Sequence, residues 1–324
     1  MQSEILRYGG FSMTNVILFL ATALIWGTTW LAIKYQLGVV HPLWSVCYRF
    51  AIAGLILLVF CRFRGLNLRF SKSDHKWIVL QAFLLFSLNY VFYYMGTDYF
   101  VSGIVAVIFA SIAIMNILNA RIFLKTPLSK SAIAGALIGL TGLGVIFRTE
   151  IYRLIDQDVM TVVTGLGICV LGTAIASIGQ IIATANMKRS LPYLQTNAIG
   201  MTYGALYTAI GALLWGELPT FDFTAKYAFS LLYLALIGTV VAFGLYMKLV
   251  QNIGPSKASY AYILIPVIAL TVSTVFESFI WTSETVLGIG MVVLGNIVAM
   301  ASKTFQSRRH KVDILPIEEQ RKAA

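Results

Sequence analysis

Long apolar segments separated by short polar ones dominate the pattern of the chain. Each apolar segment has about 18 residues or more, which as an α-helix rising 1.5 Å per residue approaches the roughly 30 Å hydrocarbon core of a bilayer. The ten segments cover residues 14–34, 43–61, 77–96, 100–122, 131–148, 161–186, 194–215, 227–250, 257–280 and 285–302. This pattern predicts an all-α integral membrane protein with ten transmembrane helices.

The second half of the chain repeats the plan of the first. Residues 101–147 align without a gap with residues 254–300 at an offset of 153, and a second match nearby has an offset of 150. Few residues are identical, so the matching order of the apolar segments is the stronger evidence for a duplication. The identical pairs are Ile112/Ile265, Phe123/Phe276, Gly135/Gly288 and Gly142/Gly295 in the first match, and Pro42/Pro192 and Gly54/Gly204 in the second.

A duplicated unit of roughly 150 residues has consequences for topology. Because each unit holds five helices, an odd number, the second unit must lie upside down relative to the first. We therefore predict two inverted five-helix repeats, over 14–148 and 161–302, and a disordered cytoplasmic tail over 303–324. Secondary transporters use such paired halves to expose one midplane site to either side in turn; a duplicated bundle without transport is the alternative.

The distribution of basic residues predicts the orientation. Hydrophobic residues make up 59% of the chain, charged residues 11%, and the mean hydropathy is +0.83, far from the values of soluble proteins. The net charge of +11 comes from loops and the tail, which argues against nucleic acid as a partner. With the N-terminus in the cytoplasm, 19 basic residues lie on the cytoplasmic side and four on the other. Both termini are therefore predicted to be cytoplasmic, in a bacterial inner membrane.

One helix carries a proline that should interrupt it. Pro266 lies in the segment 257–280, where it removes the amide that would bond to the carbonyl of Tyr262. A membrane helix tolerates such a break where the freed carbonyl faces protein, water or a ligand. We predict that Pro266 is a hinge.

Several motifs resemble a known family. They are WGTTWLAIK at 26–34, RFAIAG at 49–54, YYMGTDYFVSGIVAVI at 93–108 and ILIPVIALTVSTVFESF at 263–279. With the ten segments, they make residues 14–302 similar to the EamA-type drug/metabolite transporters. The resemblance implies a transporter, in the first place an exporter, of amino acids or similar small metabolites, which works by alternating access without a cofactor. The family commonly has a second proline in its fourth helix, but Ile112 and Ala113 stand there, so the first half is expected to lack a matching break.

Two ionisable residues within the apolar segments are candidates for function, because such groups are costly in a bilayer. Arg49 lies about 9 Å below the outer surface, and Glu277 lies near the outer end of its segment. Arg49 is predicted to bind a substrate carboxylate or to pair with Glu277 in a gate; snorkelling is the structural alternative. Glu277 is also the one carboxylate that a proton-coupled mechanism would use, while exchange against a counter-substrate or facilitated diffusion fits the sequence equally well.

Aromatic, hydroxyl and amide side chains supply the remaining candidates, because metabolite sites combine apolar walls with a few polar groups. The alternative for each is an interfacial aromatic residue or a hydrogen bond between helices. The predicted substrate-binding residues, besides Arg49, are Trp26, Thr28, Trp30, Asn89, Tyr93, Asn116, Gln180, Tyr203 and Tyr262.

The sequence offers little for catalysis. His41, His75 and His310 lie in loops or the tail, and the three cysteines lie in apolar segments, so neither a metal site nor a disulfide framework is predicted. An enzyme is the third-ranked class. A non-transporting scaffold or sensor is the main rival, and drugs or phosphorylated and nucleotide-linked metabolites are the alternative substrates. The predicted partners are a small-molecule substrate and membrane lipid; the sequence does not predict an oligomeric state.

Overall fold

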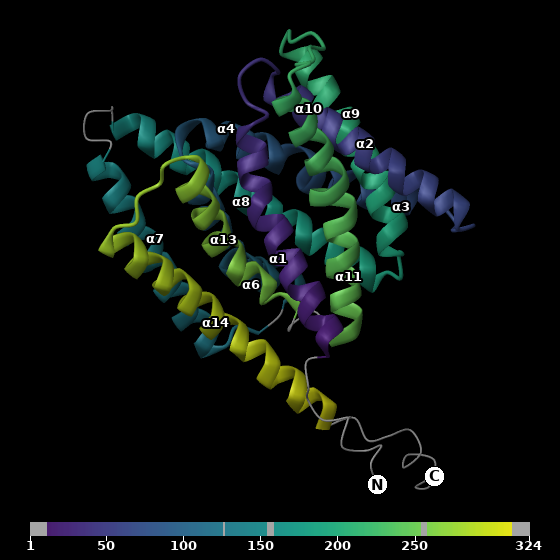
Figure 1. The fold of residues 1–324 in the computed structure, drawn as a ribbon. Coiled ribbons are helices and arrows are strands. Elements are labelled where there is room, and N and C mark those ends of the chain that lie inside the picture. Colours follow the sequence, from purple (N-terminus) through teal and green to yellow (C-terminus); the bar gives the residue numbers. More distant parts are fainter. Residues whose placement is uncertain (1–11, 126, 154–158, 254–257, 313–324) are drawn as a thin grey trace, which may run out of the picture.

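The computed structural model describes residues 12–125, 127–153, 159–253 and 258–312, and every regular element among them is helical (Figure 1). Two of the elements, η2 and η3, are π-helical. The elements are α1 (Met13–Lys34), α2 (Pro42–Phe63), α3 (Lys72–Phe83), η2 (Leu84–Leu88), α4 (Asn89–Tyr99), α5 (Ser102–Ala110), α6 (Ile112–Leu124), α7 (Lys130–Arg153), α8 (Val159–Lys188), α9 (Tyr193–Leu214), α10 (Ala225–Leu232), η3 (Tyr233–Val241), α11 (Ala242–Ile253), α13 (Ala261–Phe276) and α14 (Ser283–Val312).

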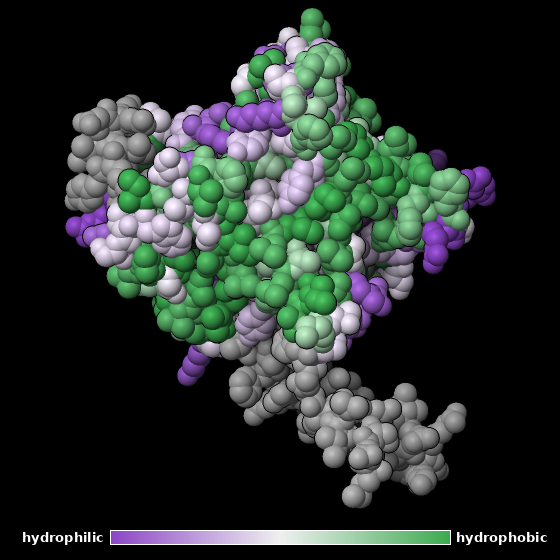
Figure 2. Space-filling view, viewed as in Figure 1, coloured by the Kyte–Doolittle hydropathy of each residue, from purple (hydrophilic) through white to green (hydrophobic). Residues whose placement is uncertain are grey.

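Each of the ten predicted apolar segments coincides with one continuous or jointed helical stretch. Among the described residues, six stretches are long and apolar enough to cross a membrane. Three shorter apolar helices begin at Lys130, Ala261 and Ser283. Helix α9 is as long as α1 but richer in polar residues. Large apolar side chains such as Phe63, Leu214 and Phe223 are more than four-fifths exposed. Figure 2 shows that apolar residues cover most of the visible face, as in a membrane protein. That all ten stretches cross the membrane stays a prediction.

The helix breaks differ from the sequence-based expectation. The fourth stretch, expected to be unbroken, is interrupted at Ser111, whose hydroxyl donates to the carbonyl of Ile108 at 2.7 Å. The amide of Ile114 bonds to Ser111 at 3.0 Å, so the carbonyl of Ala110 is released and accepts from Asn296 Nδ2 at 3.3 Å. A side chain from α14 thus takes the role of the missing helical hydrogen bond. The break has no proline that would reveal it in the sequence.

The helix with the proline, in contrast, is continuous. Pro266 lies buried within α13, and the helix runs from Ala261 to Phe276 without an interruption. The expected break at this position is therefore wrong as a description of this structure, because a proline removes only one helical hydrogen bond and packing can hold the turn. The hinge role of Pro266 stays a prediction.

Two π-helical segments occupy matching places in the two halves. Segment η2 lies in the third helical stretch and η3 in the eighth, about 150 residues later. Phe86 in η2 packs on two glycines of α9: a Cβ added to Gly204 would lie 2.4 Å from the Phe86 carbonyl oxygen. Gly238 in η3 packs closely on α1, because a Cβ added to it would lie 2.7 Å from Thr29 Cγ2. Such π segments widen a helix locally and are frequent at functional sites.

Helices that match between the two predicted repeats pack against one another. Helix α2 contacts α9, α5 contacts α13, and α7 contacts α14. The α7–α14 contact is symmetric: Gly135 contacts the Gly295 carbonyl, and Gly142 contacts the Gly288 carbonyl. Since Gly135 aligns with Gly288 and Gly142 with Gly295, exchanging the halves returns the same contact, as a two-fold axis requires.

Helix α14 continues further than expected. It extends to Val312, ten residues into the segment 303–324 that was predicted to be disordered. The prediction is wrong for 303–312, because no glycine or proline follows Gly295 in this stretch to end the helix. Residues 313–324 lie outside the described part of the chain. The start of α1 and the end of α14 lie at the same end of the bundle (Figure 1).

The close contact of α7 and α14 predicts a position-specific effect of substitution. A Cβ at position 142 would lie 2.6 Å from the Gly288 carbonyl oxygen, whereas one at position 144 meets no atom within 4 Å. We expect Gly142→Leu to separate the helices and to lower the free energy of unfolding by roughly 1–3 kcal/mol or more. Thermal unfolding of the purified protein in detergent measures the change.

Gly144→Leu is the matched control, because it adds the same side chain two residues away on the exposed side of α7. It should leave the melting temperature unchanged or raise it slightly, since leucine favours helix over glycine. Equal melting temperatures for both variants would contradict the packing described.

Candidate functional site

A cavity of about 460 Å³ lies in the middle of the bundle. Side chains from both halves of the chain line it, supplied by α1, α2, η2, α4, α5, α6, α8, α9, α11 and α13. Its lining extends from Arg49, Trp30 and Tyr93 to Met187, Tyr193, Val250 and Ser259. Met187, Tyr193 and Val250 lie at ends of their helices, and Ser259 shortly precedes α13. Asn252, next to Val250 in sequence, bonds to Asn15 at the start of α1, so the cavity extends toward that end of the bundle.

Most of the predicted substrate-binding residues meet at this cavity. Thr28 and Tyr203 lie outside it: Thr28 bonds to the Tyr233 hydroxyl at 2.6 Å, and Tyr203 bonds to His75 at 3.0 Å. The eight that line the cavity are Trp26, Trp30, Arg49, Asn89, Tyr93, Asn116, Gln180 and Tyr262. Their part in substrate binding stays a prediction.

Arg49 is the cation of this cavity. Its side chain is only 2% exposed, and its Nε donates to Thr239 Oγ1 of η3 at 3.2 Å. Thr239 in turn donates to the carbonyl of Leu234, five residues back, which is the spacing of a π-helix. The guanidinium carbon lies 4.7 Å from the ring centroid of Tyr90, within cation–π range. Its Nη1 is buried without a hydrogen bond of normal geometry, and the Tyr94 hydroxyl is a close polar neighbour of the guanidinium.

Two neutral groups at the cavity are also buried and incompletely bonded. The Oδ1 atom of Asn89 and the hydroxyl of Tyr93 belong to side chains that are 2% and 3% exposed, and neither makes a hydrogen bond of normal geometry within the described residues. The Thr173 side chain is a close polar neighbour of the Tyr93 hydroxyl. Unpaired polar atoms are costly in an apolar interior, so their presence around one cavity indicates that water or a ligand completes them. With Arg49, they provide a cationic donor, an acceptor and a hydroxyl that can act as either.

Aromatic rings form most of the remaining wall. Trp26 stacks on Tyr262 with ring centroids 5.3 Å apart, and Phe243 and Tyr246 contact Trp26 at 5.5 and 5.2 Å. Phe243 and Tyr246 were not among the residues predicted from the sequence. Their spacing of three residues within an apolar segment was the available signal, because such residues share one face of a helix.

A second aromatic group lies closer to Arg49. Trp30 and Tyr93 meet edge to face at 5.4 Å, and Phe109 contacts both rings at 5.3 and 5.6 Å. Tyr90 connects this group to the guanidinium. The cavity thus has two aromatic groups in its wall, one around Trp26 and one around Trp30, and the charge of Arg49 lies beside the second.

The amides of α6 and α8 mainly bond to each other. Asn116 donates to Gln180 Oε1 at 2.8 Å and accepts from Ser177 at 2.7 Å, while Asn119 donates to Ser177 at 2.8 Å. Asn116 therefore joins two helices, which is the structural alternative considered for it. Gln180 keeps its amide nitrogen available on the cavity side.

Glu277 does not pair with Arg49. Its carboxylate accepts from the backbone amide of Ser102 at 3.0 and 3.1 Å, from the Ser102 hydroxyl, and from Ser273 at 2.6 Å. Ser273 also accepts from the Gly103 amide at 2.8 Å. The end of α13 thus caps the start of α5, where unbonded amides and the helix dipole favour a negative charge. The ion pair considered from the sequence is absent from this structure.

Further hydrogen bonds hold the same end of the bundle together. Gln36 donates to the Tyr227 carbonyl at 3.0 Å and to Ser230 at 2.7 Å, and Ser45 bonds to the Tyr227 hydroxyl at 2.9 Å. Trp44 donates to the carbonyl of Glu217 at 3.1 Å. These contacts join α1, α2 and α10 beyond Arg49, so this end is closed while the cavity extends toward the other. No group of three or more metal-ligating side chains occurs among the residues described.

Comparisons with known proteins agree with these features. The protein PagO of Salmonella typhimurium is 24% identical over 289 residues, which cover 89% of this chain and 93% of that protein. The uncharacterized inner membrane transporter YedA of Escherichia coli K12 is 26% identical, with 87% of this chain and 89% of that protein covered. The uncharacterized transporter YoaV of Bacillus subtilis is also 26% identical, covering 80% and 87%.

The fold and a family model extend the likeness to almost the whole chain. A crystal structure of another protein superposes with a TM-score of 0.63 at 18% identity, covering 91% of this chain and 98% of that one, which shows a shared fold. The model of the EamA-like transporter family matches residues 13–148 and 163–301. This chain is therefore a multi-pass membrane protein that belongs to the EamA-like transporter family.

Proposed function

We propose that this protein is a secondary transporter that exports small carboxylate-bearing metabolites, with amino acids as the first class to test. It would act in the bacterial inner membrane by alternating access, without a bound cofactor and with both termini in the cytoplasm. The observation that carries the proposal is the buried Arg49, which lines a cavity large enough for a small metabolite and whose Nη1 makes no hydrogen bond of normal geometry.

The chemistry of the cavity suits a zwitterion. A carboxylate would accept from Arg49 Nη1, and an ammonium group would donate to Asn89 Oδ1, two atoms that otherwise lack a hydrogen bond of normal geometry. The Tyr93 hydroxyl can serve either group. Apolar or aromatic parts of the substrate would lie on Trp26, Trp30 and the rings around them. A metabolite with several phosphate charges would find only one cation here.

The closed end of the bundle and the symmetric contacts of α7 with α14 support alternating access. The bonds around Glu277 and Gln36 close one end, which the basic residues place outside, so the structure corresponds to a state open toward the cytoplasm. The contacts of α7 with α14 and the paired π segments support two inverted halves. Exchange of conformation between such halves would open the outer end and close the inner one.

Export should depend on the charge of Arg49. Arg49→Met keeps much of the apolar stem but removes every donor, so the rate of export should fall roughly 10- to 100-fold, as expected for the loss of a charge-assisted hydrogen bond. The measurement is extracellular metabolite profiling of matched cells that express wild type, variant or empty vector, with membrane insertion confirmed for each. Export of the metabolite found is then compared with export of its amide, which lacks the carboxylate. Wild type should export the acid in preference to the amide, and Arg49→Met should lose this preference.

Arg62→Met is the control, because Arg62 is an exposed arginine at the far end of the same helix. It should export like the wild type. If wild type and empty vector gave the same profile with the protein inserted, the export proposal would fail and a scaffold or sensor would take its place. If wild type exported a metabolite and Arg49→Met exported it equally well, transport would stand and the role of Arg49 would not.

The outer closure should loosen without Glu277. In Glu277→Ala, the Ser102 amide loses its acceptor. Ser273, which accepts from the Gly103 amide, loses the carboxylate it donates to. Peptides that contain residues 102–104 should therefore exchange hydrogen for deuterium roughly 10- to 100-fold faster. Glu284→Ala, which removes an exposed carboxylate from the start of α14, should leave these peptides unchanged. Unchanged exchange in Glu277→Ala would mean that the carboxylate does not hold this end together.

The proposed orientation has its own test. Single cysteines placed at Asn67 and at Phe221, in a background without Cys47, Cys61 and Cys169, should differ in labelling by a membrane-impermeant maleimide added to whole cells. Phe221 should react and Asn67 should not, because the basic residues place the two loops on opposite sides. The opposite result would invert the topology and make the present state outward-open.

A further inference from the structure

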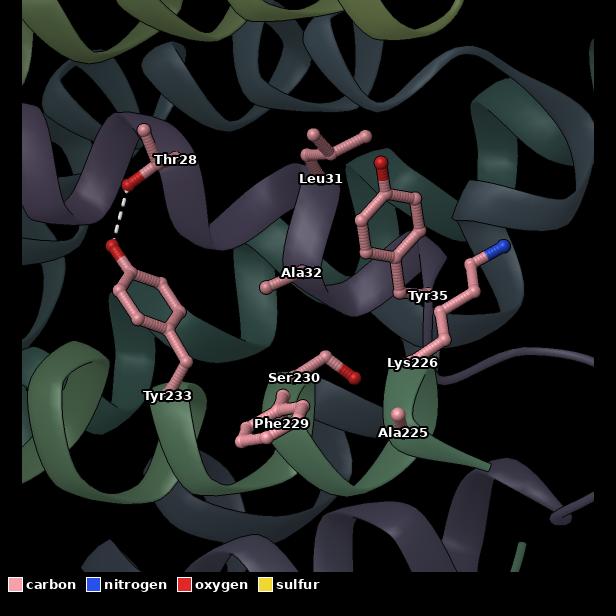
Figure 3. A pocket seen from close by; sticks show the side chains of 9 residues that line it. All are labelled: Thr28, Leu31, Ala32, Tyr35, Ala225, Lys226, Phe229, Ser230 and Tyr233. Atoms are coloured by element: carbon pink, nitrogen blue, oxygen red, sulfur yellow. Dashed lines mark hydrogen bonds between the residues drawn. The ribbon is translucent and has the colours of Figure 1, made fainter. Parts of the chain in front are cut away.

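A second hollow lies on the outside of the bundle, between the last turns of α1 and the first turns of α10 (Figure 3). Its volume is about 400 Å³, and it is separate from the central cavity, with which it shares no lining residue. Leu31 and Ala32 of α1 form its floor, and Phe229 of α10, which is 72% exposed, forms one wall. From Thr28 to Tyr35 the hollow follows α1 for roughly 10 Å.

Thr28, Ser230 and Tyr233, the polar residues along the hollow below Tyr35, are already bonded. Thr28 and Tyr233 bond to each other at 2.6 Å, as the dashed line in Figure 3 shows. Ser230 accepts from Gln36 at 2.7 Å and donates to the Tyr227 carbonyl at 2.9 Å. The hollow therefore offers little to a polar ligand along its length, and what fills it must be apolar.

The end of the hollow next to Tyr35, by contrast, carries a cation. Lys226 is exposed, and its Nζ lies 4.5 Å from the centroid of the Tyr35 ring, without an ion pair among the described residues. The nearby carboxylate of Asp222 is held by the amide and hydroxyl of Thr224, at 2.8 and 3.0 Å. Lys226 is the second residue of α10 and Tyr35 directly follows α1, so both lie where apolar helices meet polar loops. This is the depth of lipid headgroups.

We propose that this groove, formed by Leu31, Ala32, Phe229 and Lys226, binds one anionic phospholipid of the outer leaflet. The acyl chain lies in the apolar trough, and the phosphate lies against Lys226 beside Tyr35. The charge of Lys226 is complementary to the phosphate, and a trough that runs from the headgroup level into the hydrocarbon excludes a soluble anion as the natural occupant. The site is independent of the transported substrate, because the central cavity lies on the other side of α1.

Native mass spectrometry of the full-length protein tests the proposal. The protein, delipidated in detergent, is titrated with phosphatidylglycerol or with phosphatidylethanolamine of the same acyl chains, and the first bound lipid is counted. Wild type should bind phosphatidylglycerol more tightly, and Lys226→Gln should weaken this binding about fivefold, the effect expected for one lysine near the membrane surface. Lys226→Arg should retain the binding.

Two further variants separate this site from general effects. Lys72→Gln removes an exposed lysine at the opposite end of the bundle and should bind like wild type. Ala225→Trp places a large ring at the groove and should weaken binding while the melting temperature stays unchanged. Equal losses in Lys72→Gln and Lys226→Gln, or no loss in Lys226→Gln, would overturn the proposal. Displacement of the lipid by glycerol phosphate would overturn it as well, because it would identify a site for a soluble anion.

Discussion

In a bilayer the backbone has no water to bond to, and this constraint explains the irregular places of the fold. Where the fourth helical stretch breaks at Ser111, Asn296 of a neighbouring helix bonds to the released Ala110 carbonyl. Where α5 begins with unpaired amides, Glu277 and Ser273 accept from them. Where η3 widens, Thr239 bonds back to Leu234. At each of these three places a side chain completes the backbone bonding, and at Ala110 and Ser102 that side chain also ties one helix to another.

Arg49 depends on one of these completed irregularities. A guanidinium deep in a membrane helix costs about 3 kcal/mol, so it persists only with partners. Thr239 faces Arg49 because the π turn of η3 shifts the register of the helix, and Tyr90 covers the charge with its ring. These partners leave Nη1 without a hydrogen bond of normal geometry, on a side chain that lines the cavity. In the proposed function, the same arrangement that makes the charge tolerable would leave a donor for the substrate.

Sequence patterns located the helices well because apolar length has one physical cause, the thickness of the bilayer. Eight candidates reached the cavity, since polar groups in apolar helices avoid lipid; Thr28 and Tyr203 instead found a single tyrosine or histidine partner nearby. Phe243 and Tyr246 were missed because aromatic rings face lipid as readily as protein. The break at Ser111 was unpredictable without its distant partner Asn296, and Pro266 misled because one missing bond does not break a packed helix.

The two halves share helix contacts but differ in chemistry and in where a helix breaks. Contacts such as Gly135 with Gly295 and Gly142 with Gly288 survive exchange of the halves. Arg49 does not, because Ile199 stands at the matching position at an offset of 150. A fold whose halves exchange conformation makes the two open states similar in energy, whereas a single charge supplied by one half fixes how a substrate lies between them. In the proposed mechanism, symmetry would serve the motion and its absence at Arg49 would serve recognition, so the glycine contacts and Arg49 would answer to different physical demands.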